Sequence, residues 1–147
     1  MIARWLTGIA TILAAFAVSA EVIDIDNGEL AKLAAKGVPI IDIRTAGEWK
    51  TGVIPGSRLL TFFDEAGQSN PPQWLERAKA VAKPDQPVVL VCRSGNRSRR
   101  ASDFLSTQAG YGTVYNLSKG MNGWVAESRP VTAPAPGMAL CSPPAHC

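Results

Sequence analysis

Short apolar runs rich in β-branched residues alternate along the chain with segments of helical periodicity. The runs predict five strands, the fourth strongest and the third weakest, over residues 21–26, 38–44, 57–61, 87–91 and 113–117. Apolar side chains spaced on one face predict three helices, over residues 28–36, 70–82 and 97–109. Strands and helices that alternate in this way form a parallel sheet with helices on both faces. The expected fold class is therefore α/β.

The two ends of the chain differ from this pattern. Residues 1–20 carry one arginine, then fourteen uncharged residues from Trp5 to Val18, then small residues up to Ala20. This layout predicts a secretory signal peptide cleaved after Ala20. Fourteen helical residues span about 21 Å, short of the roughly 30 Å hydrocarbon core, so a retained membrane anchor is the weaker alternative. We expect an exported protein, periplasmic in a Gram-negative bacterium, without stable membrane insertion after cleavage.

Composition narrows the chemistry of what remains. A chain of 147 residues fits one domain, which we place at residues 21–129, followed by an irregular, proline-rich tail at 130–147. The net charge of +3 is too small to indicate nucleic acid as a partner. The single histidine, His146, lies next to the C-terminal end, which excludes a core Cys-His or Ser-His pair and a multi-histidine metal site. No metal and no cofactor are implied.

The segment Cys92–Ser98 lies where the strongest predicted strand gives way to a helix. In open parallel sheets ligands bind at this junction, because the loop N–H groups and the helix N-terminus together attract anions. Gly95 permits backbone angles that other residues resist. Four of the fifteen basic residues lie between positions 93 and 100, with no acid before Asp103. We expect an anion-binding loop formed by Arg93, Ser94, Gly95, Asn96, Arg97 and Ser98, with the thiol of Cys92 at its base.

Such surroundings favour the thiolate form of a cysteine, so Cys92 could act as a nucleophile without a histidine. The alternative is an inert cysteine that only caps a buried strand. The arginines, Gly95 and the strand-to-helix position favour the catalytic interpretation.

With these residues the sequence resembles the rhodanese-like sulfurtransferases in their single-domain form, from about Asn27 to Arg129. The resemblance rests on four segments together: Val38–Arg44 with Glu48, Gly52–Ser57, Cys92–Ser98 and Gly120–Trp124. It implies a central five-stranded, mostly parallel sheet and a persulfide on Cys92. It also implies a small anionic donor such as thiosulfate, and a thiophilic acceptor such as cyanide or a protein thiol. Many family members carry a histidine before the Ile-Pro-Gly segment, where this chain has Thr51, Gly52 and Val53.

Two other functions remain open at this point. Cysteine phosphatases use the same thiolate and loop, but they place five residues between cysteine and arginine. Here four residues separate Cys92 from Arg97, which favours sulfur over phosphate. The second alternative is a non-catalytic or partner-loaded persulfide-binding module, against which the retained Cys92 argues.

Two residue pairs accompany the loop. Asp42 and Arg44 end a core strand at the same edge of the sheet, and they predict a structural ion pair that supports the site. The alternative is that Asp42 orients groups of the loop or accepts from an arginine. Cys141 and Cys147 lie in the tail, and two tail cysteines in an exported protein indicate a disulfide. A resolving thiol pair or a soft-metal site is the alternative for these cysteines.

Overall fold

The computed structural model describes residue 12 and residues 20–141. Five strands form one sheet in the order β1-β5-β4-β2-β3, and each neighbouring pair is parallel. The strands are β1 (Glu21–Ile25), β2 (Ile40–Asp42), β3 (Arg58–Leu59), β4 (Val88–Val91) and β5 (Thr113–Leu117). The predicted parallel α/β architecture is confirmed, and each predicted strand is present, with β2 and β3 shorter than expected.

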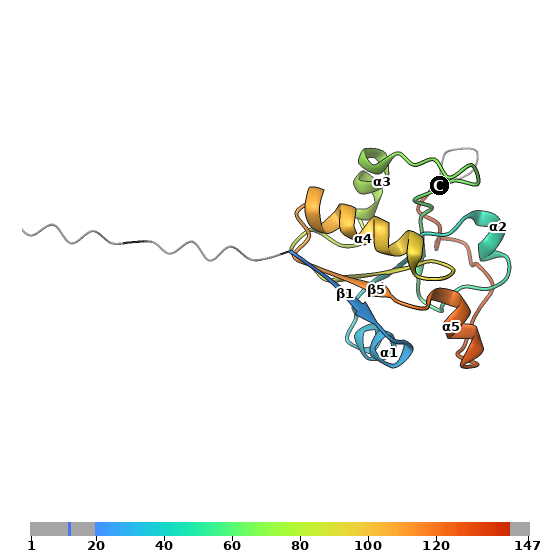
Figure 1. The fold of residues 1–147 in the computed structure, drawn as a ribbon. Helices are drawn as coiled ribbons and strands as arrows, with labels where there is room; N and C mark the ends of the chain where they lie inside the picture. Colours follow the sequence, from blue (N-terminus) through green and yellow to red (C-terminus); the bar gives the residue numbers. More distant parts are fainter. Residues whose placement is uncertain (1–11, 13–19, 142–147) are drawn as a thin grey trace, which may run out of the picture.

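Helices cover both faces of this sheet. They are α1 (Asn27–Ala35), α2 (Ala46–Trp49), α3 (Pro71–Ala78), α4 (Asn96–Gln108) and α5 (Gly120–Ala126). Figure 1 shows α3 and α4 on one face and α1 and α5 on the other. Successive residues of a strand point to opposite faces, so Val88 and Leu90 pack in the core under α3 and α4, while Val89 and Val91 pack in the core over α1 and α5.

Local sequence signals set where the helices begin. Asp26 caps α1, because its Oδ1 accepts the N–H of Glu29 at 2.8 Å. The Glu29 carboxylate in turn accepts the N–H of Asp26. Asn70 caps α3 ahead of two prolines, because its side-chain oxygen accepts the N–H of Gln73 at 3.2 Å. The prediction that this helix continues to Ala82 is wrong: α3 ends at Ala78, and residues 79–82 follow as hydrogen-bonded turns that still bury Ala82.

Two helices were not predicted from the sequence. α2 is a single turn, too short to show a periodic pattern. α5 holds Gly120 and Gly123, which lower helix propensity, and it buries Met121 and Trp124 against the sheet. Tertiary packing therefore stabilises α5 where propensity does not.

The segment 130–141 forms no helix or strand, but it follows the outer edge of the sheet. Val53 and Thr132 exchange two backbone hydrogen bonds of 2.9 Å, and Leu59 of β3 bonds to Met138 and Leu140. The predicted boundary at residue 129 stays a prediction. The predicted signal peptide lies almost wholly outside the described residues, and within the described part no helix is long and apolar enough to cross a membrane.

Candidate active site

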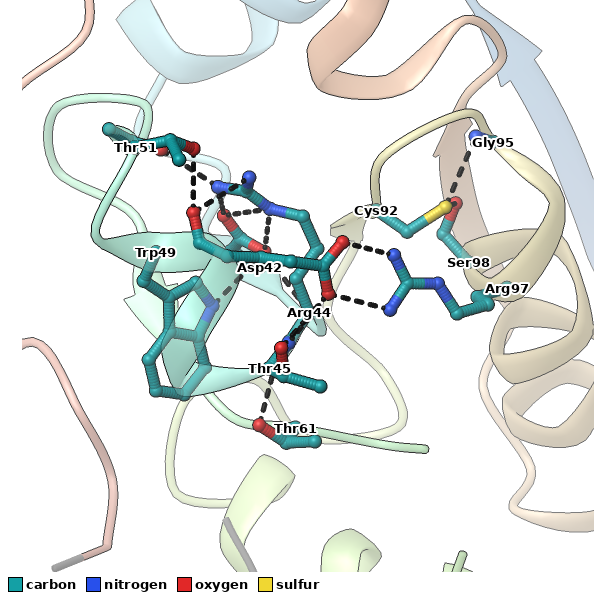
Figure 2. Close-up of polar contacts among 12 residues, drawn as sticks. Asp42, Arg44, Thr45, Trp49, Thr51, Thr61, Cys92, Gly95, Arg97 and Ser98 are labelled. Carbon is teal, nitrogen blue, oxygen red and sulfur yellow. Dashed lines mark hydrogen bonds and ion pairs between the residues drawn. The ribbon is translucent and has the colours of Figure 1, made fainter. Parts of the chain in front are cut away.

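The loop between β4 and α4 carries Cys92, at the carboxyl edge of the sheet. Cys92 follows the buried strand directly, and its side chain has no exposed surface. Its Sγ accepts the N–H of Gly95 at 3.1 Å and lies 3.2 Å from the Ser98 hydroxyl, as Figure 2 shows. The predicted strand-to-helix placement of Cys92 is therefore present. Because the sulfur is covered, a reactant can reach it only after local movement of the loop or of the side chains over it.

Gly95 gives the loop its path. It adopts φ = +93° as the residue before α4, and a Cβ at this position would overlap the carbonyl oxygen of Ser118. Only glycine fits both the backbone angle and this close approach. The turn directs the Gly95 N–H at Cys92, as the sequence suggested.

The first turn of α4 points unpaired donors toward the same place. The N–H groups of Asn96, Arg97 and Ser98 have no acceptor among the described residues, as is usual for the first turn of a helix. Such donors, with the positive end of the helix dipole, form an anion-binding position. Of the residues from Arg93 to Ser98, Gly95 and Ser98 contact the sulfur, while the role of these residues toward a substrate stays a prediction.

The start of α5 supports the loop that carries Cys92. The N–H groups of Met121 and Asn122 donate to the carbonyls of Cys92 and Arg93, both at 2.9 Å. Gly120 precedes them at φ = +56°, and a Cβ there would lie 2.5 Å from the Cys92 carbonyl oxygen. The start of α5 therefore holds the cysteine loop in place, whereas the sequence marked Gly120–Trp124 only as part of the family resemblance.

The charge of the loop differs from the sequence expectation. Arg97 donates two hydrogen bonds to the Glu48 carboxylate, at 2.9 and 2.6 Å. Arg99 pairs with Asp24 and Asp103, and Arg100 lies over the ring of Phe63 at 4.5 Å. Three of the four arginines in the segment 93–100 thus have partners, and Glu48, Asp24 and Phe63 are distant from them in the sequence. Arg93 is the exception, since it has no ion pair or ring contact with any described residue.

The Glu48–Arg97 pair has strong electrostatic consequences. The hydrogen bonds from Arg97 lower the pKa of Glu48 from 4.5 to about 2, and the N–H of Thr45 acts in the same direction. The pKa of Arg97 is raised above its usual value, first by Glu48 and further by the nearby charges of Cys92 and Asp42. Sequence reasoning noted Glu48 only as part of a motif. The spacing Thr45-x-x-Glu48, which forms a capping box on α2, was the available signal.

Asp42 and Arg44 lie together at the end of β2, fully inside the protein. Arg44 donates to both oxygens of Asp42, at 2.8 Å in the closest contact, and to the Gly52 carbonyl at 2.8 Å. Trp49 donates its indole N–H to Asp42 at 3.3 Å (Figure 2). The pair therefore ties β2 to the segment after α2, beside the cysteine loop.

A pocket lies between these elements and α5. Its lining joins Arg93 of the loop to the following residues: Arg44, Glu48, Thr51, Gly52, Met121, Asn122 and Val125. It offers one unpaired guanidinium and an apolar wall next to the loop that carries Cys92.

Only one cysteine of the predicted tail disulfide lies within the described residues. Cys141 is half-buried against the core under α3 and α4, and Cys147 lies outside the described residues. The pairing of Cys141 with Cys147 stays a prediction. Cys92 is a free thiol.

The chain is similar in sequence to known proteins. The Rhodanese-like domain family matches residues 26–127. A sulfurtransferase of Allochromatium vinosum is 34% identical over 113 residues, which cover 76% of this chain and 95% of the relative. The thiosulfate sulfurtransferase GlpE of Pseudoalteromonas translucida is 31% identical over 97 residues, covering 66% of this chain and 82% of the relative.

Solved structures agree in fold. The crystal structure of Rv0390 from M. tuberculosis has a TM-score of 0.64 at 23% identity, covering 79% of this chain and all of that one. A rhodanese-related protein from Thermoplasma volcanium has a TM-score of 0.60 at 26% identity, covering 76% of this chain and 99% of that one. With the family match over most of the chain, these findings show that the protein belongs to the rhodanese-like domain family.

Proposed function

We propose that this protein is a sulfurtransferase that carries sulfane sulfur as a persulfide on Cys92. The observation that carries the proposal is the position of the Cys92 sulfur, beneath the Gly95 N–H and beside the unpaired N–H groups of the first turn of α4. Donors in this arrangement stabilise a thiolate, a persulfide anion and an anionic substrate in turn. Relatives named as sulfurtransferases, at 31–34% identity, support the same function.

The reaction has two steps. In the first, the Cys92 thiolate attacks the outer sulfur of thiosulfate, the S–S bond breaks, and sulfite leaves with the bonding electron pair. In the second, cyanide or a thiolate attacks the terminal sulfur of the Cys92 persulfide. The S–S bond breaks again, the acceptor leaves as thiocyanate or as a persulfide, and the Cys92 thiolate is regenerated. No external oxidant or reductant is needed.

Arg93 is the residue we assign to recruitment of the anionic donor. Unlike Arg97 and Arg99, its guanidinium is not neutralised by a described carboxylate, and it lines the pocket beside the loop. A free guanidinium binds a sulfonate-like group by paired hydrogen bonds. Glu48 and Arg44 line the same pocket, but their charges are paired with Arg97 and Asp42, so among the described lining residues Arg93 is the cation left to bind an anion.

Intact mass spectrometry tests the function directly. Folded protein treated with thiosulfate is expected to gain one sulfur atom and to lose it as thiocyanate after cyanide is added. The Cys92→Ser variant, checked for folding by circular dichroism, is expected to do neither. An unchanged mass of the folded wild-type protein would refute loading by this donor and would favour a partner-loaded or non-catalytic module.

We also propose that the protein is exported, because residues 1–20 have the three-part pattern of a signal peptide. The N-terminal residue of the protein recovered from its native cells tests this. Glu21 at the N-terminus in an exported fraction is expected, and an intact Met1 in the cytoplasmic fraction would contradict it.

A further inference from the structure

The hydroxyl of Ser98 lies between the Cys92 sulfur and a second buried acceptor. Its Oγ is 3.2 Å from Cys92 Sγ and 2.6 Å from Oδ1 of Asn116 in β5. Ser98 is fully buried and Asn116 is nearly so. A serine hydroxyl has one hydrogen and two lone pairs, so Ser98 donates a full hydrogen bond to only one of these two atoms at a time.

The orientation of the Asn116 amide decides which one. Its Nδ2 lies 2.8 Å from the carboxylate of Asp24 in β1 and 3.3 Å from the carbonyl oxygen of Gly95. Both of these groups only accept hydrogen bonds, so the amide nitrogen has to face them and Oδ1 has to face Ser98. In the short 2.6 Å contact Ser98 donates its hydrogen bond to Asn116 Oδ1, and a lone pair of Ser98 Oγ then faces the sulfur.

We propose that Asn116, oriented by Asp24, is a positioning residue that directs the single proton of Ser98 away from Cys92 while Cys92 is a thiol. The Cys92 S–H then donates to Ser98 Oγ. When the sulfur loses its proton to solvent, the Ser98 hydroxyl turns toward it and joins the Gly95 N–H. The inference rests on the proposed function only in taking Cys92 as the nucleophile.

This exchange has a physical consequence. When Ser98 turns toward the anionic sulfur, Oδ1 of Asn116 stays buried without a donor, and an unpaired buried acceptor is unfavourable. Asn116 therefore competes with the Cys92 sulfur for the Ser98 hydrogen, and variants at Asn116 change this competition. Asp24 takes part from the surface, because its side chain is 51% exposed and bridges Asn116 to Arg99.

Other charged groups near the sulfur are the same in the wild-type protein and in variants at Asn116 or Ser98. They are Arg97 of α4 with Glu48 of α2, the Asp42–Arg44 pair at the end of β2, Arg93 in the loop, and Lys119 ahead of α5. Within the described residues, the hydrogen bonds between side chains that lead from the sulfur to the surface run through Ser98, Asn116 and Asp24.

Thiolate absorbance in the ultraviolet, titrated with pH in the full-length protein, tests the proposal without any sulfur donor. The signal of the Cys92→Ser variant is subtracted to isolate Cys92. In Asn116→Leu, the midpoint of the titration is expected to fall by about one pH unit, because Ser98 no longer has a competing acceptor. In the Ser98→Ala background, Asn116→Leu is expected to leave the midpoint where Ser98→Ala alone puts it. An equal shift in both backgrounds would overturn the proposal.

Variants at the exposed Asp24 test the same idea without altering the core. Asp24→Asn removes the charge but keeps an oxygen that accepts from Asn116, whereas Asp24→Ala removes both. A lower midpoint in Asp24→Ala than in Asp24→Asn is expected, and equal midpoints would overturn the role of Asp24 in orienting the amide. Glu21→Ala, also on β1, controls for the loss of one negative charge. Failure of these titrations would leave the thiosulfate result standing, and failure of sulfur loading would leave the titrations standing.

Discussion

Two ion pairs lie beside the Cys92 loop, and they differ in how far their side chains are exposed to solvent. Asp42 and Arg44 are fully buried, with 1% and 4% of their side chains exposed, whereas Glu48 and Arg97 keep 28% and 29%. A buried pair left half intact is strongly unfavourable, while a partly exposed pair contributes modestly and responds to pH. The two pairs therefore serve the site differently, one as a fixed support and one as a charge that can be titrated.

The Glu48–Arg97 pair predicts a specific dependence of stability on pH. The folded-state pKa of Glu48 is about 2, below its ordinary 4.5, so the stabilisation is complete above pH 4.5 and is lost as the pH falls toward 2. Glu48→Gln is expected to lower the free energy of unfolding by about 1 kcal/mol at neutral pH. Urea unfolding across pH is the measurement. The difference between variant and wild type should shrink below pH 4.5, and a difference that is constant down to pH 2.5 would contradict the assignment.

Replacement of Arg44 has a larger expected effect. Arg44→Leu leaves the Asp42 carboxylate buried with only the Trp49 indole and backbone groups as partners, which is expected to destabilise the fold by about 3–5 kcal/mol. Urea unfolding at neutral pH measures this. Asp42→Leu combined with Arg44→Leu removes both charges and should recover part of the loss. A single variant as stable as wild type would show that the pair is not a structural support.

At the scale of elements, the cysteine loop is held between the start of α4 and the start of α5. Gly95, the N-cap of α4, supplies the N–H group that bonds to the sulfur, and α5 supplies the two N–H groups that hold the Cys92 and Arg93 carbonyls. Gly120 lets α5 approach the loop this closely. The geometry at the sulfur therefore depends on a helix that contributes no side chain to the loop itself.

Gly120→Ala tests this dependence. The added Cβ would lie 2.5 Å from the Cys92 carbonyl oxygen and from the Arg93 backbone, so we expect the loop to shift and stability to fall. Gly110→Ala is the matched control, because Gly110 also has a positive φ, +74°, but open space around its Cβ position. The control is expected to lose about 1–2 kcal/mol from backbone strain alone. Gly120→Ala is expected to lower the free energy of unfolding, measured with urea, by at least about 2 kcal/mol more than the control does. It is also expected to abolish sulfur loading of Cys92. Equal losses of stability in the two variants would count against the close approach of α5 to the loop.

At the scale of the whole molecule, the sheet has one edge that is partly covered by the C-terminal segment. β3 lies at that edge, and residues 132–140 supply hydrogen bonds to Val53 and Leu59. Trp124 also donates its indole N–H to the Pro130 carbonyl at 2.9 Å, which fixes where the segment begins. Covering an edge strand satisfies its backbone groups and discourages pairing with other chains.

A chain ending at Arg129 tests this contribution. In this truncated chain the amides of Val53 and Leu59 lose their acceptors. Their rates of hydrogen exchange are therefore expected to rise by about tenfold or more. The amide of Val89, in the central strand β4, serves as the internal control. Unchanged protection of Leu59 would show that the segment is not part of the folded unit, and equal acceleration at Val89 would indicate global loss of stability instead.

The sequence by itself determined the features whose causes are local. Apolar runs such as 87–91 form strands wherever they are buried on both faces, and Gly95 after Cys92 permits one sharp path into a helix. The parallel sheet, its five strands and the position of the candidate nucleophile followed from these signals and the family resemblance.

Only the tertiary structure decided which charges and polar groups meet. Glu48 and Arg97 are 49 residues apart, and Asp24 and Asn116 are 92 apart, so no pattern within a window indicates their contact. The order of the strands brings β1 beside β5 and β2 beside β4, and this order carries Asp24 to Asn116 and Glu48 to Arg97. Two of the four arginines in the segment 93–100 are thus paired with carboxylates, and the partners Glu48 and Asp24 come from distant parts of the chain that the fold brings back to this segment.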